Sequence, residues 1–192
     1  LWFKQILHEV DYLQQGLEAA NAPQALQALK RSRTILKTMV SQVDILETMT
    51  PIQFESFRHR LQASSGFQSA QYRLMEFIMG GRDPDMVTMH EAVPETAEML
   101  RGELAKPSLY DVSLQLLKAR GFEIPDEVLE RDRTGPHERS DAVEKAWAAI
   151  YAEPEEYWEL YELAEKLVDL EYHFQRWRFG HLKTVERIIG FK

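Results

Sequence analysis

Apolar residues recur at steps of three and four positions through most of this sequence, which is the spacing of one face of an α-helix. The pattern predicts helices over residues 1–19, 23–47, 51–62 and 67–78. Thr50 followed by Pro51 predicts the start of the third helix, because a threonine hydroxyl caps free backbone N–H groups and proline suits the first helical position. No segment alternates convincingly at a period of two, so we expect no β-sheet.

The longest predicted helix lies near the end of the sequence, from Pro154 to about Gly190. Gly180 is the only glycine inside it, and about 37 residues would span ~55 Å at a rise of ~1.5 Å per residue. Its apolar stripe advances in steps of three and four through Leu160, Leu163, Leu167, Leu170, Phe174, Trp177, His181, Val185 and Ile188.

The stretch 84–153 differs from the rest of the sequence, because prolines and glycines divide it into shorter predicted helices. These pieces are predicted near residues 91–105, 107–120, 125–131 and 139–152. We interpret this stretch as a helical insertion and not as a separate domain. Residues 1–192 are therefore predicted to form a single all-α domain, a bundle of long helices with a small helical insertion subdomain.

Composition and charge exclude several classes of function. A net charge of −8 argues against nucleic-acid binding, because binding to phosphates requires basic side chains. The absence of cysteine excludes disulfides, thiolate zinc sites and iron–sulfur clusters. No apolar run approaches the roughly 18–20 residues that a membrane-spanning helix needs, and no signal-peptide pattern occurs. We therefore expect a cytoplasmic protein that binds neither nucleic acid nor membranes.

His181 interrupts the apolar stripe of the longest helix, one turn after Trp177 and one turn before Val185. It could be a core histidine with a hydrogen-bonded partner. It could instead be an axial ligand of iron, because a neutral imidazole in an apolar pocket between helices often holds heme. Gly180 would then let the flat macrocycle approach closely. Three basic residues within a turn could meet heme propionates or lie on the surface: Arg176, Arg178 and Lys183.

Arg58 is the second polar residue on an apolar stripe, where Phe54, Leu61 and then Ser65 share its face of the third predicted helix. A buried guanidinium requires an anion, because an unpaired buried charge is costly. That anion could be a carboxylate of a neighbouring helix or the carboxylate of a substrate held by two hydrogen bonds. The following Ser64-Ser65-Gly66 would add hydroxyl and backbone donors.

Three blocks of sequence occur in a specific order. They are Leu1-Trp2-Phe3-Lys4-Gln5-Ile6-Leu7, then Phe54-Glu55-Ser56-Phe57-Arg58 with Ala63-Ser64-Ser65-Gly66-Phe67-Gln68-Ser69-Ala70-Gln71-Tyr72-Arg73, then Arg176-Trp177-Arg178-Phe179-Gly180-His181 with Val185-Glu186-Arg187-Ile188-Ile189-Gly190. Together they resemble the tryptophan 2,3-dioxygenase family, and the similarity spans essentially the whole sequence.

The resemblance implies a helical, homotetrameric, cytosolic enzyme with a heme b pocket between its helices. Such enzymes insert both atoms of O2 across the indole C2–C3 bond of L-tryptophan and release N-formyl-L-kynurenine. By position, His181 would be the axial iron ligand and Arg58 would bind the substrate carboxylate. Phe54, where some members have tyrosine, and Leu61 would line the substrate pocket. Ser64, Ser65 and Gly66 would line the distal face of the heme, with Ser65 next to the substrate.

The resemblance also places two family features outside this sequence. The distal histidine and a nearby phenylalanine lie just before the stretch that matches Leu1, so no catalytic residue is assigned within 1–192. A Gly-Thr-Gly-Gly loop that closes over the substrate lies just after the stretch that matches Lys192. We therefore expect the sequence to be trimmed at both ends, and we expect efficient turnover to require both segments.

Two other functions stay open at this stage. The first is a heme-binding sensor or carrier that uses His181 without oxygenating a substrate. The second is a cofactor-free helical interaction protein in which His181 and Arg58 are core residues with satisfied hydrogen bonds. Strong heme binding without turnover would favour the first, and a colourless protein that hemin cannot reconstitute would favour the second.

Overall fold

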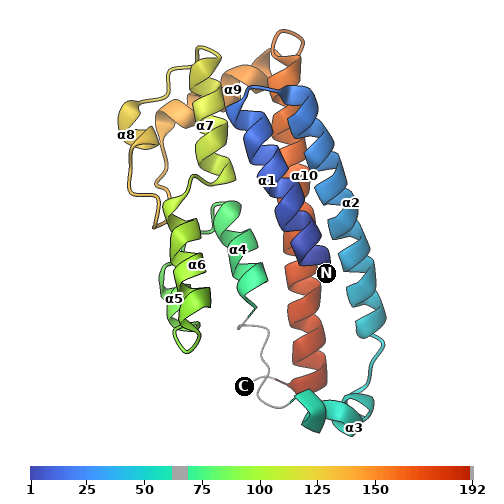
Figure 1. Ribbon diagram of the computed structural model, residues 1–192. Helices are drawn as coiled ribbons and strands as arrows, with labels where there is room; N and C mark the ends of the chain where they lie inside the picture. Colours follow the sequence, from blue (N-terminus) through green and yellow to red (C-terminus); the bar gives the residue numbers. More distant parts are fainter. Residues whose placement is uncertain (62–68, 191–192) are drawn as a thin grey trace.

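Three long helices lie side by side along the molecule (Figure 1). They are α1 (Trp2–Glu18), α2 (Ala22–Leu46) and α10 (Trp158–Ile189), and α2 packs along both of the others. This computed structural model describes residues 1–61 and 69–190, and within them every regular element is a helix and no strand occurs. The predicted all-α fold with a bundle of long helices is therefore confirmed.

The shorter helices lie mainly beside α1, on the side away from α2 (Figure 1). They are α3 (Pro51–Leu61), α4 (Ala70–Ile78), α5 (Asp85–Thr88), α6 (Pro94–Ala105), α7 (Leu109–Ala119), α8 (Asp126–Leu129) and α9 (Asp141–Ala152). Helices α4 and α7 pack on α1, whereas α3 packs on the C-terminal end of α10. No helix in residues 1–61 or 69–190 is both long and apolar enough to span a bilayer.

The tight turn between α1 and α2 brings these two helices into contact. The side chain of Asn21 caps α2 by accepting a hydrogen bond from the backbone N–H of Gln24 at 3.3 Å. Gly16 permits the close approach of α2, because a Cβ atom at this position would lie 3.0 Å from the backbone nitrogen of Ala25.

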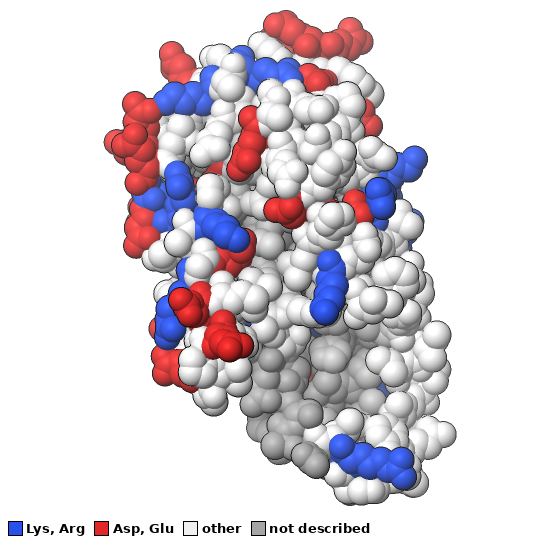
Figure 2. All heavy atoms as spheres, in the orientation of Figure 1, with Lys and Arg blue, Asp and Glu red and all other residues white. Residues whose placement is uncertain are grey.

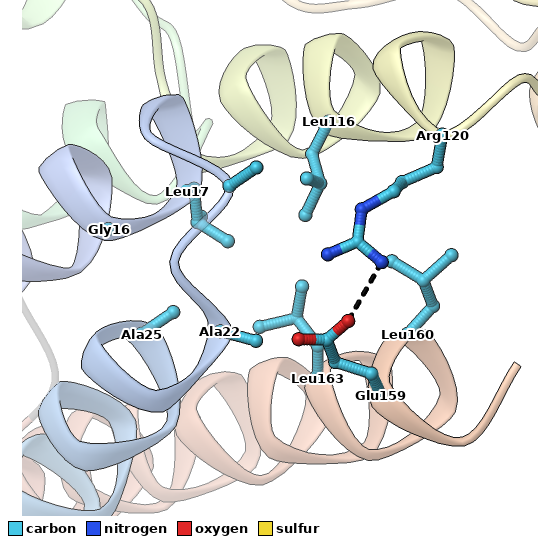
Figure 3. A pocket seen from close by; sticks show the side chains of 10 residues that line it. Gly16, Leu17, Ala22, Ala25, Leu116, Arg120, Glu159, Leu160 and Leu163 are labelled. Atoms are coloured by element: carbon cyan, nitrogen blue, oxygen red, sulfur yellow. Dashed lines mark hydrogen bonds and ion pairs between the residues drawn. The ribbon is translucent and has the colours of Figure 1, made fainter.

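The end of the bundle that holds this turn is closed (Figure 3). A void of about 10 Å³ lies between the ends of α1, α2, α7 and α10, and it has room for no more than one water molecule. Beside it, Arg120, which directly follows α7, and Glu159 of α10 form an ion pair of 2.7 Å. This end of the bundle therefore serves packing and offers no ligand site.

The apolar core follows the helix faces that the spacing predicts. Its most fully buried large side chains on the long helices are Ile6, Leu13, Leu29, Leu36, Leu163 and Leu170, and a smaller cluster under α6 contains Phe77, Val87 and Leu100. Each buried leucine or isoleucine stabilises the fold by roughly 1.5–3 kcal/mol relative to an exposed one. The bundle is thus built around α1, α2 and α10.

Helix boundaries agree with the predicted ones to within a few residues, with three differences. The four-residue helix α5 was not predicted, because so short a piece shows no apolar period. The helix predicted over 91–105 begins at Pro94, and the helix predicted from Pro154 begins at Trp158 after a turn. The Thr50 cap is confirmed, since its hydroxyl accepts a hydrogen bond from the backbone N–H of Gln53 at 3.3 Å.

Candidate functional site

His181 projects from the C-terminal half of α10 and is partly buried. Its imidazole stacks on the indole of Trp177, one turn earlier, with ring centroids 5.3 Å apart and planes only 7° from parallel. Burial lowers the pKa of His181 below its ordinary value, so the ring is neutral near pH 7. A neutral imidazole keeps a nitrogen lone pair that can bind a metal.

Trp177 also belongs to an aromatic cluster. The ring of Phe3, from α1, meets the Trp177 indole edge-on at 5.0 Å, and Tyr72, from α4, lies 5.8 Å from it. Tyr72 also stacks on Phe174 of α10 at 5.7 Å. Three helices that are far apart in sequence therefore meet beside His181.

Tyr72 connects this cluster to a buried ion pair. Its hydroxyl donates a hydrogen bond of 2.6 Å to Glu76, one turn later on α4. Glu76 is also paired with Arg73, whose side chain is buried. Burial, followed by the hydrogen bond to Glu76, raises the pKa of the Tyr72 hydroxyl well above its ordinary value, so the phenol keeps its proton.

The basic residues near His181 have their own contacts. Lys183 forms an ion pair of 2.7 Å with Glu186 and lies over the ring of Phe179. Arg176 lies over the ring of Tyr172, with 5.8 Å between the guanidinium carbon and the ring centroid. Arg178 lines a cleft and contributes a positive charge near Tyr72.

Gly180 has a different role from the one expected. A Cβ atom at this position would lie 3.1 Å from Cγ1 of Val43 on α2, so this glycine lets α2 and α10 pack closely. The interpretation that Gly180 makes room for a macrocycle is therefore corrected, because the space beside it is filled by α2.

Helix α3 carries the predicted substrate residues, and it has no buried residue. Arg58 is 47% exposed and forms an ion pair of 3.6 Å with Glu55 of the same helix. Leu61 is 43% exposed, and Phe54 packs edge-on against Phe57 at 5.3 Å. The expected burial of Arg58 is therefore wrong for this structure, because no neighbouring helix covers that face among the described residues. Ser64, Ser65 and Gly66 lie outside the described residues.

An open cleft of about 660 Å³ lies between α4, α7, α9 and α10. Aromatic and charged side chains line it, including Tyr110, Trp147, Tyr151, Phe174 and Arg178. Its volume would suit a small ligand, but His181 and Arg58 are not among its lining residues. Within the part of the chain that the structure describes, no group of three or more His, Asp or Glu side chains could hold a metal ion.

Comparisons with known proteins agree on one family. The family model for tryptophan 2,3-dioxygenase matches residues 1–96 and 90–192. The chain is 56% identical to the tryptophan 2,3-dioxygenase of Erythrobacter litoralis over 192 residues, which are all of this chain and 73% of that protein. It is 44% identical to the Bacillus cereus enzyme of the same name, again over all of this chain, and covers 69% of it. The chain belongs to the tryptophan 2,3-dioxygenase family.

The surroundings of His181 suit the heme that this family binds. A single neutral imidazole on a helix is a sufficient protein ligand for heme iron, because the porphyrin supplies four nitrogens. The flat indole of Trp177 already packs on the imidazole, and cationic side chains lie within one turn of it in the sequence. The residues present therefore fit a heme on this side of α10.

Sequence reasoning missed one feature of the candidate site. Trp177 was placed on the apolar stripe, but its stacking on His181 and its contacts with Phe3 and Tyr72 were not foreseen. The hydrogen bond from Tyr72 to Glu76 has a local signal, because residues four apart are neighbours on a helix. The contact between Tyr72 and Trp177 has none, since it joins two helices through the tertiary fold.

Proposed function

We propose that this chain is the core of a heme-dependent enzyme that cleaves the indole C2–C3 bond of L-tryptophan with O2. The product is N-formyl-L-kynurenine, so the reaction opens the degradation of tryptophan through kynurenine. The observation that carries this proposal is the match to the tryptophan 2,3-dioxygenase family over the whole chain. The neutral imidazole of His181 beside an aromatic cluster supports it at the level of the site.

His181 is the residue that would hold heme b by binding its iron. Ser64 and Gly66 would be further residues in contact with the heme. When bound, the heme supplies the activation of O2 that no side chain of this protein can provide. The share of the protein is to hold the imidazole neutral, to bury the reacting atoms and to keep water out.

Substrate orientation would fall to α3 and the residues that follow it. Arg58 would exchange its weak pairing with Glu55 for the carboxylate of L-tryptophan, with which a guanidinium can form two parallel hydrogen bonds. Phe54, Leu61 and Ser65 would surround the bound amino acid. Phe54 has no hydroxyl to offer, so Arg58 carries the recognition of the carboxylate.

This recognition would also reject molecules that lack a carboxylate. Plain indole would leave the guanidinium without its partner, and a site built for a hydrogen-bonded group discriminates strongly against the analogue that lacks it. A fixed carboxylate also fixes the direction of the indole C2–C3 bond, which is the orientation that oxygenation requires.

The assembly and the setting of the enzyme are part of the proposal. We expect a homotetramer in the cytoplasm, as the family implies. The exposed apolar side chains on the C-terminal half of α10 are compatible with burial between subunits. No observation favours the alternative of a heme sensor or carrier, and the experiment below separates it from the enzyme.

The experiment compares the chain, extended at both ends by the segments that its relatives carry, with three variants. His181→Ala should abolish the Soret band that hemin gives with the parent, because the axial imidazole is lost. Arg58→Gln should keep that band but raise the KM for L-tryptophan by about 10-fold or more, since a charge-assisted bidentate hydrogen bond is lost. Arg60→Gln, two residues later and also exposed, is the matched control and should behave as the parent.

Each result has a clear meaning. A Soret band that does not change in His181→Ala would contradict the assignment of the iron ligand. Hemin binding without formation of N-formyl-L-kynurenine would support the sensor or carrier instead. Equal KM values for Arg58→Gln and Arg60→Gln would remove Arg58 from the substrate site.

A further inference from the structure

The imidazole of His181 is held by a ring and not by a hydrogen bond. Trp177 lies parallel to it at 5.3 Å, and no hydrogen bond from either imidazole nitrogen is found among the residues that the structure describes. The torsion that rotates an imidazole plane is broad and has no strong intrinsic preference. A parallel indole one turn away limits the range of this torsion, because rotation of the imidazole would break the stack.

Trp177 is itself fixed from two other helices. Phe3 of α1 meets the indole at an interplanar angle of 87°, and Tyr72 of α4 lies 5.8 Å away. An edge-on contact with Phe3 and a tilted contact with Tyr72 restrict the rotation of the indole. The orientation of Trp177 therefore depends on helices that do not carry the iron ligand.

Tyr72 is anchored in turn by polar contacts that are largely buried. Its hydroxyl donates to Glu76 at 2.6 Å, and Glu76 is held by Arg73. The side chains of Arg73 and Glu76 are only 7% and 14% exposed. A hydrogen bond to a charged group in such surroundings is stronger than one at the surface, so the Tyr72 ring is held firmly.

We propose that Trp177, supported by Phe3 and by the Tyr72–Glu76–Arg73 chain, is a positioning residue that sets the plane of the His181 imidazole for iron binding. The inference rests on the proposed function, because it assigns a role toward the heme that His181 would hold. It extends that function, since it names the residues that orient the ligand. Partners that orient a metal-bound histidine are normally hydrogen-bond acceptors, and here an aromatic stack fills this role.

The test uses the extended protein reconstituted with hemin and a matched pair of tryptophan substitutions on α10. Trp177→Leu removes the stack, whereas Trp158→Leu makes the same change at a residue that is 60% exposed and lies at the other end of the helix. Trp177→Phe keeps a ring beside His181, and Tyr72→Phe removes only the hydroxyl that donates to Glu76. The readouts are the dissociation constant for hemin and the iron–histidine stretching band of the ferrous protein in resonance Raman spectra.

We expect Trp177→Leu to weaken hemin binding by about 10-fold or more and to shift or broaden the iron–histidine band. Trp177→Phe should restore most of both properties, Tyr72→Phe should broaden the band with a smaller loss of affinity, and Trp158→Leu should match the parent. The inference is overturned if Trp177→Leu has the parent's affinity and band, or if Trp158→Leu shows the same changes as Trp177→Leu.

A measurement without heme keeps the inference falsifiable if Trp177→Leu fails to fold. The NMR signals of the His181 ring protons in the heme-free parent should be shifted upfield by the stacked indole, and this shift should become smaller in Tyr72→Phe. No change in Tyr72→Phe would contradict the anchoring chain. Failure of the proposed function would give a different result, because His181→Ala would then bind hemin as well as the parent does.

Discussion

The two halves of α10 have the same spacing of apolar residues but opposite surroundings. Residues 158–174 contribute six buried side chains to the bundle, whereas residues 175–189 contribute only Thr184 among those described. Large apolar side chains of the second half stay exposed, namely Phe179, Leu182, Val185 and Ile189. The first half builds the core, and the second half carries His181.

The difference shows that a helical period reports which residues share a face and not what covers that face. Helix α10 packs mainly on α2, with smaller contacts to α3 and α9. Helix α3 lies at its C-terminal end, and Trp177 of the second half also contacts Phe3 of α1 and Tyr72 of α4. In the same orientation, Figure 2 shows acidic side chains gathered over the α7–α9 side, and the lower right of the surface is mostly uncharged. An apolar face left uncovered near a candidate site is a surface that a ligand or a partner can use.

The largest effect that we expect from a test of this difference between the two halves of α10 is on the free energy of unfolding. Leu163→Ala, in the first half, should lower the free energy of unfolding by about 2–5 kcal/mol, because it leaves a cavity in a core where this side chain is only 2% exposed. Leu182→Ala, in the second half, is the matched change at a side chain that is 48% exposed in the single chain, and in a sample dilute enough to dissociate the subunits it should cost less than about 1 kcal/mol. Urea denaturation followed by circular dichroism measures both.

A large decrease in the free energy of unfolding of Leu182→Ala would contradict this comparison. A decrease as great as that of Leu163→Ala would mean that the second half of α10 is covered in solution, as it would be in a tetramer. Dilution then provides the control, since stability that depends on association falls as the protein concentration falls.

A second prediction concerns a close contact that the second half makes with α2. Gly180→Ala should destabilise the fold by about 1–2 kcal/mol, because its new Cβ would lie 3.1 Å from Cγ1 of Val43. Gly102→Ala in α6 is the matched control, since no atom lies within 4 Å of its Cβ position, and it should stabilise the helix by about 0.5–1 kcal/mol. Thermal unfolding should therefore shift in opposite directions, and equal shifts would contradict the close packing of α2 on α10.

Most of the fold was predictable because its long helices are amphipathic and have clear ends. The stripe from Leu160 to Phe174 is buried as expected except at Leu167, which is half-buried, and Pro51 stands at the first position of α3. The four residues of α5 were missed, since helix periodicity needs more than one turn to be visible. Gly180 was misread for a related reason, because a sequence does not reveal which helix approaches a glycine.

The candidate site was only half predictable. His181 could be singled out since an imidazole on an apolar stripe is unusual, and the structure keeps it partly buried. Arg58 was singled out by the same argument, yet it is exposed on a helix that has no buried residue. The stack of Trp177 on His181 and the support from Tyr72 depend on the meeting of three helices, and no spacing within one helix encodes that.

The smallest expected effect compares two histidines of α10 through the pH dependence of stability. His173 is buried in the first half, where Arg33 donates a hydrogen bond of 3.4 Å to its Nε2. Burial, followed by the positive charges of Arg33 and Lys37, lowers the pKa of His173 below its ordinary value, although Asp169 opposes this shift. Since the pKa is lower in the folded state, the contribution to stability is complete above about pH 6.5 and is lost as the pH falls through the folded-state pKa.

Between pH 7.5 and pH 5, the parent should therefore lose more stability than His173→Gln, by an amount on the order of 1 kcal/mol or less. The exposed His8→Gln on α1 is the matched control, because it removes a histidine without touching the contact between His173 and Arg33. His181→Gln should also reduce the loss, since burial lowers the pKa of this ring as well. An equal loss in the parent and in His173→Gln would show that the first half of α10 does not hold His173 neutral. The two halves of α10 would then differ in packing alone, and not in their effect on the protonation of a histidine.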